Sequence, residues 1–186
     1  MPTSEIIEKN YELYLKKLSE LGIDPTVLAE KFGSNIKIAT YNFSNKDCVG
    51  CGDGELLQVV LRKLTPIALG INKLLPEEKQ VEPASIIKVC LLSQLSKSVM
   101  VVPNTNKWEV ENRGMLYKFD DYPYAMKMGM RSVSICIQCG IILNDNELEA
   151  ISNLDREEDK QTKYFSITLS TVLRQAVELT DLMNKK

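Results

Sequence analysis

Residues 85–97 read SIIKVCLLSQLSK, and this stretch decides the fold that we assign to the chain. Apolar residues such as Ile86 and Leu92 occupy most sides of the helix that it predicts, which indicates a central helix packed on several sides. The apolar run ends in two short polar residues, Ser93 and Gln94. Their side chains either hydrogen-bond locally where the helix ends or belong to a functional site.

Length and composition are those of an ordinary globular protein with one core. The chain has 186 residues, of which 44% are hydrophobic and 26% charged. A net charge of -2 gives no reason to expect nucleic acid or an anionic membrane as a partner. No apolar run is long enough to span a bilayer, and the first residues do not resemble a signal peptide. We therefore expect a cytoplasmic protein whose five cysteines are mostly reduced.

The chain contains no histidine. This excludes Ser-His and Cys-His nucleophile pairs, histidine general bases, and metal sites that depend on imidazole. Any chemistry must therefore use carboxylates, thiols, lysine or tyrosine.

Helical periodicity and capping residues predict helices on both sides of the central one. They cover residues 5–21, 25–32, 54–75, 123–140, 145–154 and 165–183. Gly33 is expected to end the second of these, and Pro66 to interrupt the third because proline cannot donate to the preceding turn. Residues 35–53 are predicted to form a loop or a partly extended connection.

After the central helix the apolar period changes from helical to alternating. Residues 99–102, 108–111 and 116–119 read as short strands, with a hairpin turn at residues 112–114. The sequence therefore predicts a small antiparallel insertion at about residues 99–119 in an otherwise helical chain.

Two segments around the central helix resemble motifs of the HD-domain phosphohydrolases, in particular small bacterial and phage-type members. Residues 53–61 read DGELLQVVL and are similar to a family motif like E-G-G-L-L-E-H-S-L. Residues 91–97 read LLSQLSK and are similar to L-L-H-D-L-C-K, which holds the defining His-Asp pair. Val59, Ser93 and Gln94 stand where the family has these metal ligands.

Later segments extend the resemblance. Residues 122–133 are similar to a post-hairpin motif like F-P-x-G-H-G-E-K-S-V, and residues 143–154 to a motif like L-T-D-E-E-x-x-A-I-R-W-H. Met128 and Leu154 stand at the histidine positions of these motifs. Asp181 matches the aspartate of an H-x-A-D-like motif, which is the closing metal ligand of the family.

The resemblance implies a mainly α, HD-domain-like helical bundle with the small hairpin as an insertion. We expect a single domain over residues 1–186, with N-terminal helices and a connection over residues 1–50 and the HD-like core over residues 51–184. In the family, a divalent metal held by two histidines and two aspartates activates water for attack on a phosphate ester or nucleotide.

The departures from the family pattern predict that this activity is lost. Of the four ligand positions only Asp181 keeps a metal-binding carboxylate, and one carboxylate does not hold a catalytic metal at useful affinity. We therefore expect no catalytic residue and no cofactor, and a binding or regulatory role. Lys97 matches the family lysine, and Arg131 lies beside Ser132. These residues either retain a phosphorylated small molecule or nucleotide, or are surface cations.

Two alternatives stay open, and no protein partner is indicated. One is a metal-dependent phosphohydrolase that uses unfamiliar carboxylate ligands, namely Asp120, Asp121, Glu178 and Asp181. The other is an interaction module stabilised by zinc, because two C-x-x-C pairs could supply four thiolates. These are Cys48, Cys51, Cys136 and Cys139. The last two lie on an apolar helical face, where free cysteine behaves as a small hydrophobe.

Overall fold

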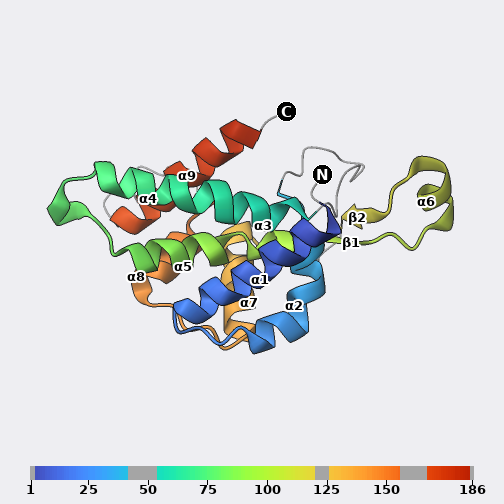
Figure 1. Cartoon of the computed structure of the whole chain (residues 1–186), viewed down its shortest axis with the longest axis horizontal. Coiled ribbons are helices and arrows are strands. Elements are labelled where there is room, and N and C mark those ends of the chain that lie inside the picture. Colours follow the sequence, from blue (N-terminus) through green and yellow to red (C-terminus); the bar gives the residue numbers. More distant parts are fainter. Residues whose placement is uncertain (1–2, 42–53, 120–125, 156–166, 185–186) are drawn as a thin grey trace.

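The computed structural model of the chain describes residues 3–41, 54–119, 126–155 and 167–184. It is mainly helical, with one small antiparallel sheet of two strands (Figure 1). This confirms the predicted helical bundle with a small hairpin. The elements are α1 Ser4–Glu20, α2 Thr26–Ile38, α3 Glu55–Val59, η1 Val60–Leu64, α4 Thr65–Leu74, η2 Glu77–Lys79, α5 Pro83–Ser93, η3 Leu95–Val99, β1 Val101–Pro103, α6 Lys107–Arg113, β2 Tyr117–Phe119, α7 Met128–Gln138, α8 Asp145–Ser152 and α9 Thr168–Asn184.

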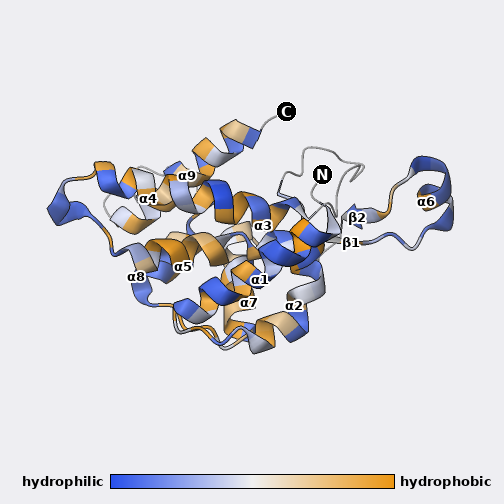
Figure 2. Cartoon of the chain, in the orientation of Figure 1, coloured by the Kyte–Doolittle hydropathy of each residue, from blue (hydrophilic) through white to orange (hydrophobic). Residues whose placement is uncertain are grey.

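Helix α5 lies at the centre of the bundle, as its sequence predicts. It packs against α1, α4, α7, α8 and α9, and hydrophobic residues line much of its length (Figure 2). All residues from Val89 to Ser98 are buried, so the chain stays inside the core through the end of α5 and the 3₁₀ turn η3. Among the described residues, no helix is both long and apolar enough to cross a membrane.

Helix α2 corrects one predicted boundary. Gly33 does not end this helix, which continues to Ile38, so residues 35–38 are helical rather than part of a loop. A side chain at residue 33 would overlap the hydroxyl of Tyr11 from α1. Glycine here makes room for the close packing of two helices and does not form a left-handed turn. Residues 42–53, the rest of the predicted connection, lie outside the described residues.

Pro66 interrupts its helix as predicted. The chain runs as a short α-helix, then as the π-helical segment η1, and then as α4, with Pro66 in the first turn of α4. Thr65 donates both its backbone N–H and its side-chain hydroxyl to the Val60 carbonyl, the latter at 2.8 Å. The wider turn accommodates a residue that has no N–H to donate.

The hairpin is an arm that projects from one end of the bundle (Figure 1). Strands β1 and β2 pair antiparallel, with Val102 opposite Lys118. The predicted strand at residues 108–111 is wrong, because these residues belong to helix α6 at the tip of the arm. Asn106 caps its first turn, and Gly114 ends it in a left-handed conformation instead of forming a hairpin turn.

Helices α7, α8 and α9 complete the bundle with shifted ends. Helix α7 begins at Met128, after two described residues that are not helical, α8 ends at Ser152, and α9 begins at Thr168. Residues 120–125 and 156–166 lie outside the described residues, which leaves the charged stretch after Asp155 untested. The predicted apolar stripe of α9 is buried from Leu169 to Ala176.

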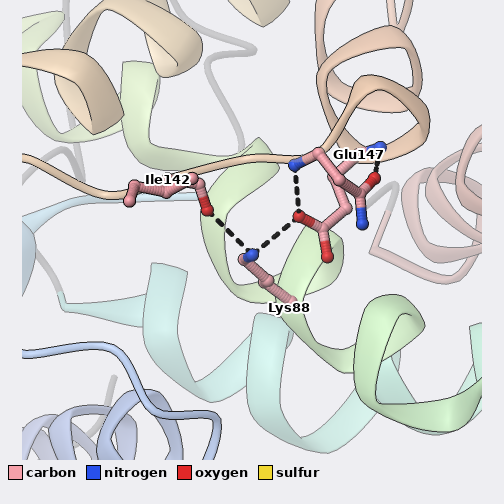
Figure 3. Close-up of polar contacts among 4 residues, drawn as sticks. Lys88, Ile142 and Glu147 are labelled. Carbon is pink, nitrogen blue, oxygen red and sulfur yellow. Dashed lines mark hydrogen bonds and ion pairs between the residues drawn. The ribbon is translucent and has the colours of Figure 1, made fainter.

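A buried ion pair joins α5 to α8 (Figure 3). Glu147 is 3% exposed, and its carboxylate accepts from the Lys88 ammonium at 2.6 Å and from the Asn144 backbone N–H at 3.0 Å. Asn144 in turn accepts from the Glu147 backbone N–H, which completes the predicted capping box. Lys88 also donates to the Ile142 carbonyl at 2.9 Å. This one carboxylate therefore caps α8 and fixes it to the central helix.

We predict that Glu147→Ala lowers the free energy of unfolding by about 3 kcal/mol, because it leaves the partly buried Lys88 ammonium without its counter-ion and removes the capping side chain of α8. Urea denaturation followed by far-UV circular dichroism measures the loss. Lys9→Ala is the matched control, since Lys9 forms an equally short but exposed ion pair with Glu5 at 2.7 Å. It should leave stability unchanged within error. Equal losses in both variants would contradict the prediction.

Gly129 is where α7 and α8 approach most closely, because a side chain there would overlap the Ile151 carbonyl oxygen. We predict that Gly129→Ala destabilises the protein by about 2 kcal/mol or more, since backbone must move to admit the methyl group. Gly70→Ala is the control, because residue 70 lies in α4 with nothing within 4 Å of the added methyl. That variant should gain up to about 1 kcal/mol from helix propensity. Thermal unfolding of both variants decides the prediction.

Candidate functional site

The candidate site centres on Lys97, which η3 carries into the interior directly after the central helix. Its side chain is 8% exposed, so Lys97 is not a surface cation. The ammonium donates to the Tyr41 backbone carbonyl at 2.9 Å and lies 3.6 Å from the centroid of the Tyr41 ring. A carbonyl and an aromatic face thus replace part of the water that the cation has lost.

Tyr41 connects this lysine to Asp181. Tyr41 is 1% exposed, and its hydroxyl donates to Asp181 Oδ1 at 2.8 Å. The pKa of the Tyr41 phenol is strongly raised by burial and, next, by the negative charge of Asp181. Tyr41 therefore stays protonated and donates to Asp181. Through Tyr41, the side chains of Lys97 and Asp181, which are distant in sequence, are connected.

Burial and charge oppose each other at Lys97. Burial lowers the pKa of the Lys97 ammonium to about 8, while the carboxylates of Asp181 and Asp155 act to raise it. At neutral pH the ammonium is therefore mostly charged, and it sits in the field of two carboxylates. Asp155 also accepts from the Gly129 backbone N–H at 2.8 Å, which holds it at the start of α7.

Ser132 joins the end of the central helix to α7. Its hydroxyl is fully buried, donates to the Ser93 carbonyl at 2.7 Å and accepts from the Ser96 backbone N–H at 3.0 Å. Because it holds both sides of the turn at Gln94, this hydroxyl has a structural role and is not directed at a ligand. The neighbouring Arg131 is half-buried.

The elements that carry the four positions matched by the resemblance to metal ligands pack against one another. These elements are segment α3–η1, helix α5 and helix α9. Val59 is buried hydrocarbon, and Asp181 is half-buried. The Ser93 hydroxyl donates to the Cys90 carbonyl at 3.4 Å and accepts from the Gln94 side-chain amide at 3.4 Å. Both polar residues thus hydrogen-bond locally at the helix end, the simpler of the two interpretations.

The other two histidine positions flank the same region. Met128 and Leu154 are half-buried, at the start of α7 and just after α8. These helices pack closely through Gly129 and Ile151. Apolar side chains therefore occupy positions at which the family motifs place imidazoles.

The residues of the two alternative hypotheses are only partly described. Cys48, Cys51, Asp120 and Asp121 lie outside the described residues. Cys136 and Cys139 are buried, as predicted for an apolar helical face, and burial raises the pKa of the Cys136 thiol to about 12. Glu178 is exposed. Within the described segments, no three acidic or thiol side chains form a group suited to a metal ion.

A surface cavity of about 440 Å³ lies elsewhere, between η2 and the starts of α5, α8 and α9. Val81, Asn144 and Thr168 are among the residues that line it. Thr168 and Asp181 lie at opposite ends of α9, roughly 20 Å apart at 1.5 Å per residue. This cavity is therefore separate from the site around Lys97.

Sequence reasoning missed two members of the site, Tyr41 and Asp155. Tyr41 lies in the stretch that was predicted as a loop or partly extended connection, and Asp155 lies between two predicted helices. Their partners are distant in sequence, at Lys97 and Asp181 for Tyr41 and at Gly129 for Asp155. No local spacing signals such contacts.

Comparison with protein-family models, with characterised proteins and with solved structures finds no match to this chain.

The lowered pKa of Lys97 predicts a specific pH dependence of the free energy of unfolding. Its pKa falls from 10.5 in the unfolded chain to about 8 in the fold, so between these values the unfolded state binds more protons and stability rises with pH. We expect the free energy of unfolding of the wild type, relative to Lys97→Met, to increase above pH 8 with a slope of up to about 1.4 kcal/mol per pH unit.

Urea denaturation of both proteins at pH 7, 8, 9 and 10 measures this difference. The comparison is necessary because the thiols of Cys90 and Cys136, whose pKa values burial raises to about 12, lower stability in both proteins above pH 9. A difference that stays constant with pH would show that Lys97 does not titrate in this range.

Proposed function

We propose that this chain is a non-catalytic, HD-domain-like protein that acts by binding or regulation, in a cytoplasmic setting. The order of the four sequence motifs supports the ancestry, and the helical bundle with its hairpin after the central helix agrees with it. The buried, unpaired thiols Cys90, Cys136 and Cys139 fit a reducing compartment.

One observation carries the loss of catalysis: the remaining carboxylate, Asp181, is engaged by the chain itself. Its Oδ1 atom accepts from the Tyr41 hydroxyl, and the Lys97 ammonium lies against the same tyrosine. At the other three positions that the resemblance matches to metal ligands, the chain has a buried valine, a serine bound to its own helix and a neutral amide. Water activation requires a Lewis acid with several ligands, and these residues do not provide them.

The ligand that we propose is a phosphorylated small molecule or a nucleotide, bound without being cleaved. Lys97 on η3 and Arg131 on α7 support this, because these two elements pack against each other. A guanidinium binds phosphate through paired hydrogen bonds, and an ammonium contributes charge. Arg131 is the more accessible of the two and makes the first contact.

The test combines metal analysis, activity and ligand binding on the purified wild type. We expect no stoichiometric metal, no Mn²⁺-stimulated hydrolysis of p-nitrophenyl phosphate or nucleotides, and a rise in melting temperature with a nucleotide that Arg131→Ala abolishes. Turnover that depends on Mn²⁺ would establish the phosphohydrolase instead. Stoichiometric zinc that is lost in Cys51→Ser would establish the zinc-stabilised module.

A further inference from the structure

Tyr41 links the Lys97 ammonium on η3 to the Asp181 carboxylate on α9. Asp181 is half-buried, and the exposed Asp155 after α8 adds a second negative charge that acts on Lys97. Carboxylates attract cations, and divalent ions most strongly. Here the chain supplies a cation of its own, the Lys97 ammonium.

We propose that Tyr41 and Lys97 together exclude divalent cations from Asp181. The Tyr41 hydroxyl occupies Oδ1 of the carboxylate at 2.8 Å, and the Lys97 ammonium, held by the Tyr41 carbonyl at 2.9 Å, supplies the positive charge that a metal would bring. The two residues form one unit, because the ammonium also packs on the ring whose hydroxyl binds Asp181.

The energetics favour the internal cation over an external one. A divalent ion that approaches Asp181 meets the ammonium in a region shielded from water, where like charges repel strongly. At Oδ1 it also competes with the Tyr41 hydroxyl, and displacing that buried hydroxyl would leave it unpaired, which costs about 1–3 kcal/mol. The Lys97 ammonium belongs to the chain itself and has neither of these unfavourable contributions.

This inference goes beyond the proposed function. The absence of ligands at Val59 and Ser93 explains why a metal would bind weakly. The further inference assigns an active role to Tyr41 and Lys97, which do not stand at positions of family metal ligands. It depends on contacts within the fold and holds for any ancestry of the chain.

The experiment measures Mn²⁺ binding by isothermal titration calorimetry to wild type, Tyr41→Phe, Lys97→Met and the double variant. Methionine matches lysine in length without its charge, and phenylalanine keeps the ring and removes the hydroxyl. We expect no binding to the wild type, detectable binding to each single variant, and a dissociation constant on the order of 1 mM for the double variant. Adding Asp181→Asn to the double variant should abolish binding.

Lys97→Arg is the matched control, since it keeps the positive charge and should not bind Mn²⁺. Binding by the wild type as tight as by the double variant overturns the inference, and so does a folded double variant that does not bind. If the Lys97→Met variants fail to fold, Tyr41→Phe decides, and equal absence of binding in it and the wild type overturns the inference. Binding by the wild type without turnover contradicts this inference and the expected absence of metal but leaves the proposed non-catalytic role, whereas turnover contradicts the proposed function.

Discussion

The burial of the Lys97 ammonium determines how the chain is arranged just after the central helix. Lys97 follows a central helix whose last turn is fully buried, so the backbone carries its charge into the core. A buried cation requires oxygen atoms and negative charge nearby. The chain meets this requirement with the carbonyl and ring of Tyr41 and with carboxylates from the segments after α8 and in α9. Elements from both ends of the chain are thereby fixed to its middle.

Much of the fold could be predicted because its signals are local. Helix periodicity, the capping box at Asn144 and the interruption at Pro66 depend on residues within a few positions of one another, and the structure confirms each. The wrong predictions arose where one local sequence pattern is compatible with two different structures. Gly33 resembled a helix end but serves close packing against Tyr11, and the alternating pattern near Trp108 fitted a strand equally well as a short helix with one exposed face.

The site was predicted less completely, for a physical reason. Lys97 and Asp181 were found because each lies in a recognisable motif, and helix packing brings these motifs together. Tyr41 contributes through contacts to residues 56 and 140 positions away, which only the folded chain creates. Ser132 illustrates the opposite case: a motif singled it out, yet its hydroxyl bridges two backbone groups around Gln94.

The arm formed by β1, α6 and β2 is held together by its own contacts. Its two strands pair with each other, and α6 is capped by its own residues Asn106 and Gly114. Substitution or lengthening of its tip would therefore not disturb the core. Trp108 at this tip is 59% exposed, so replacing its indole removes little packing from the bundle.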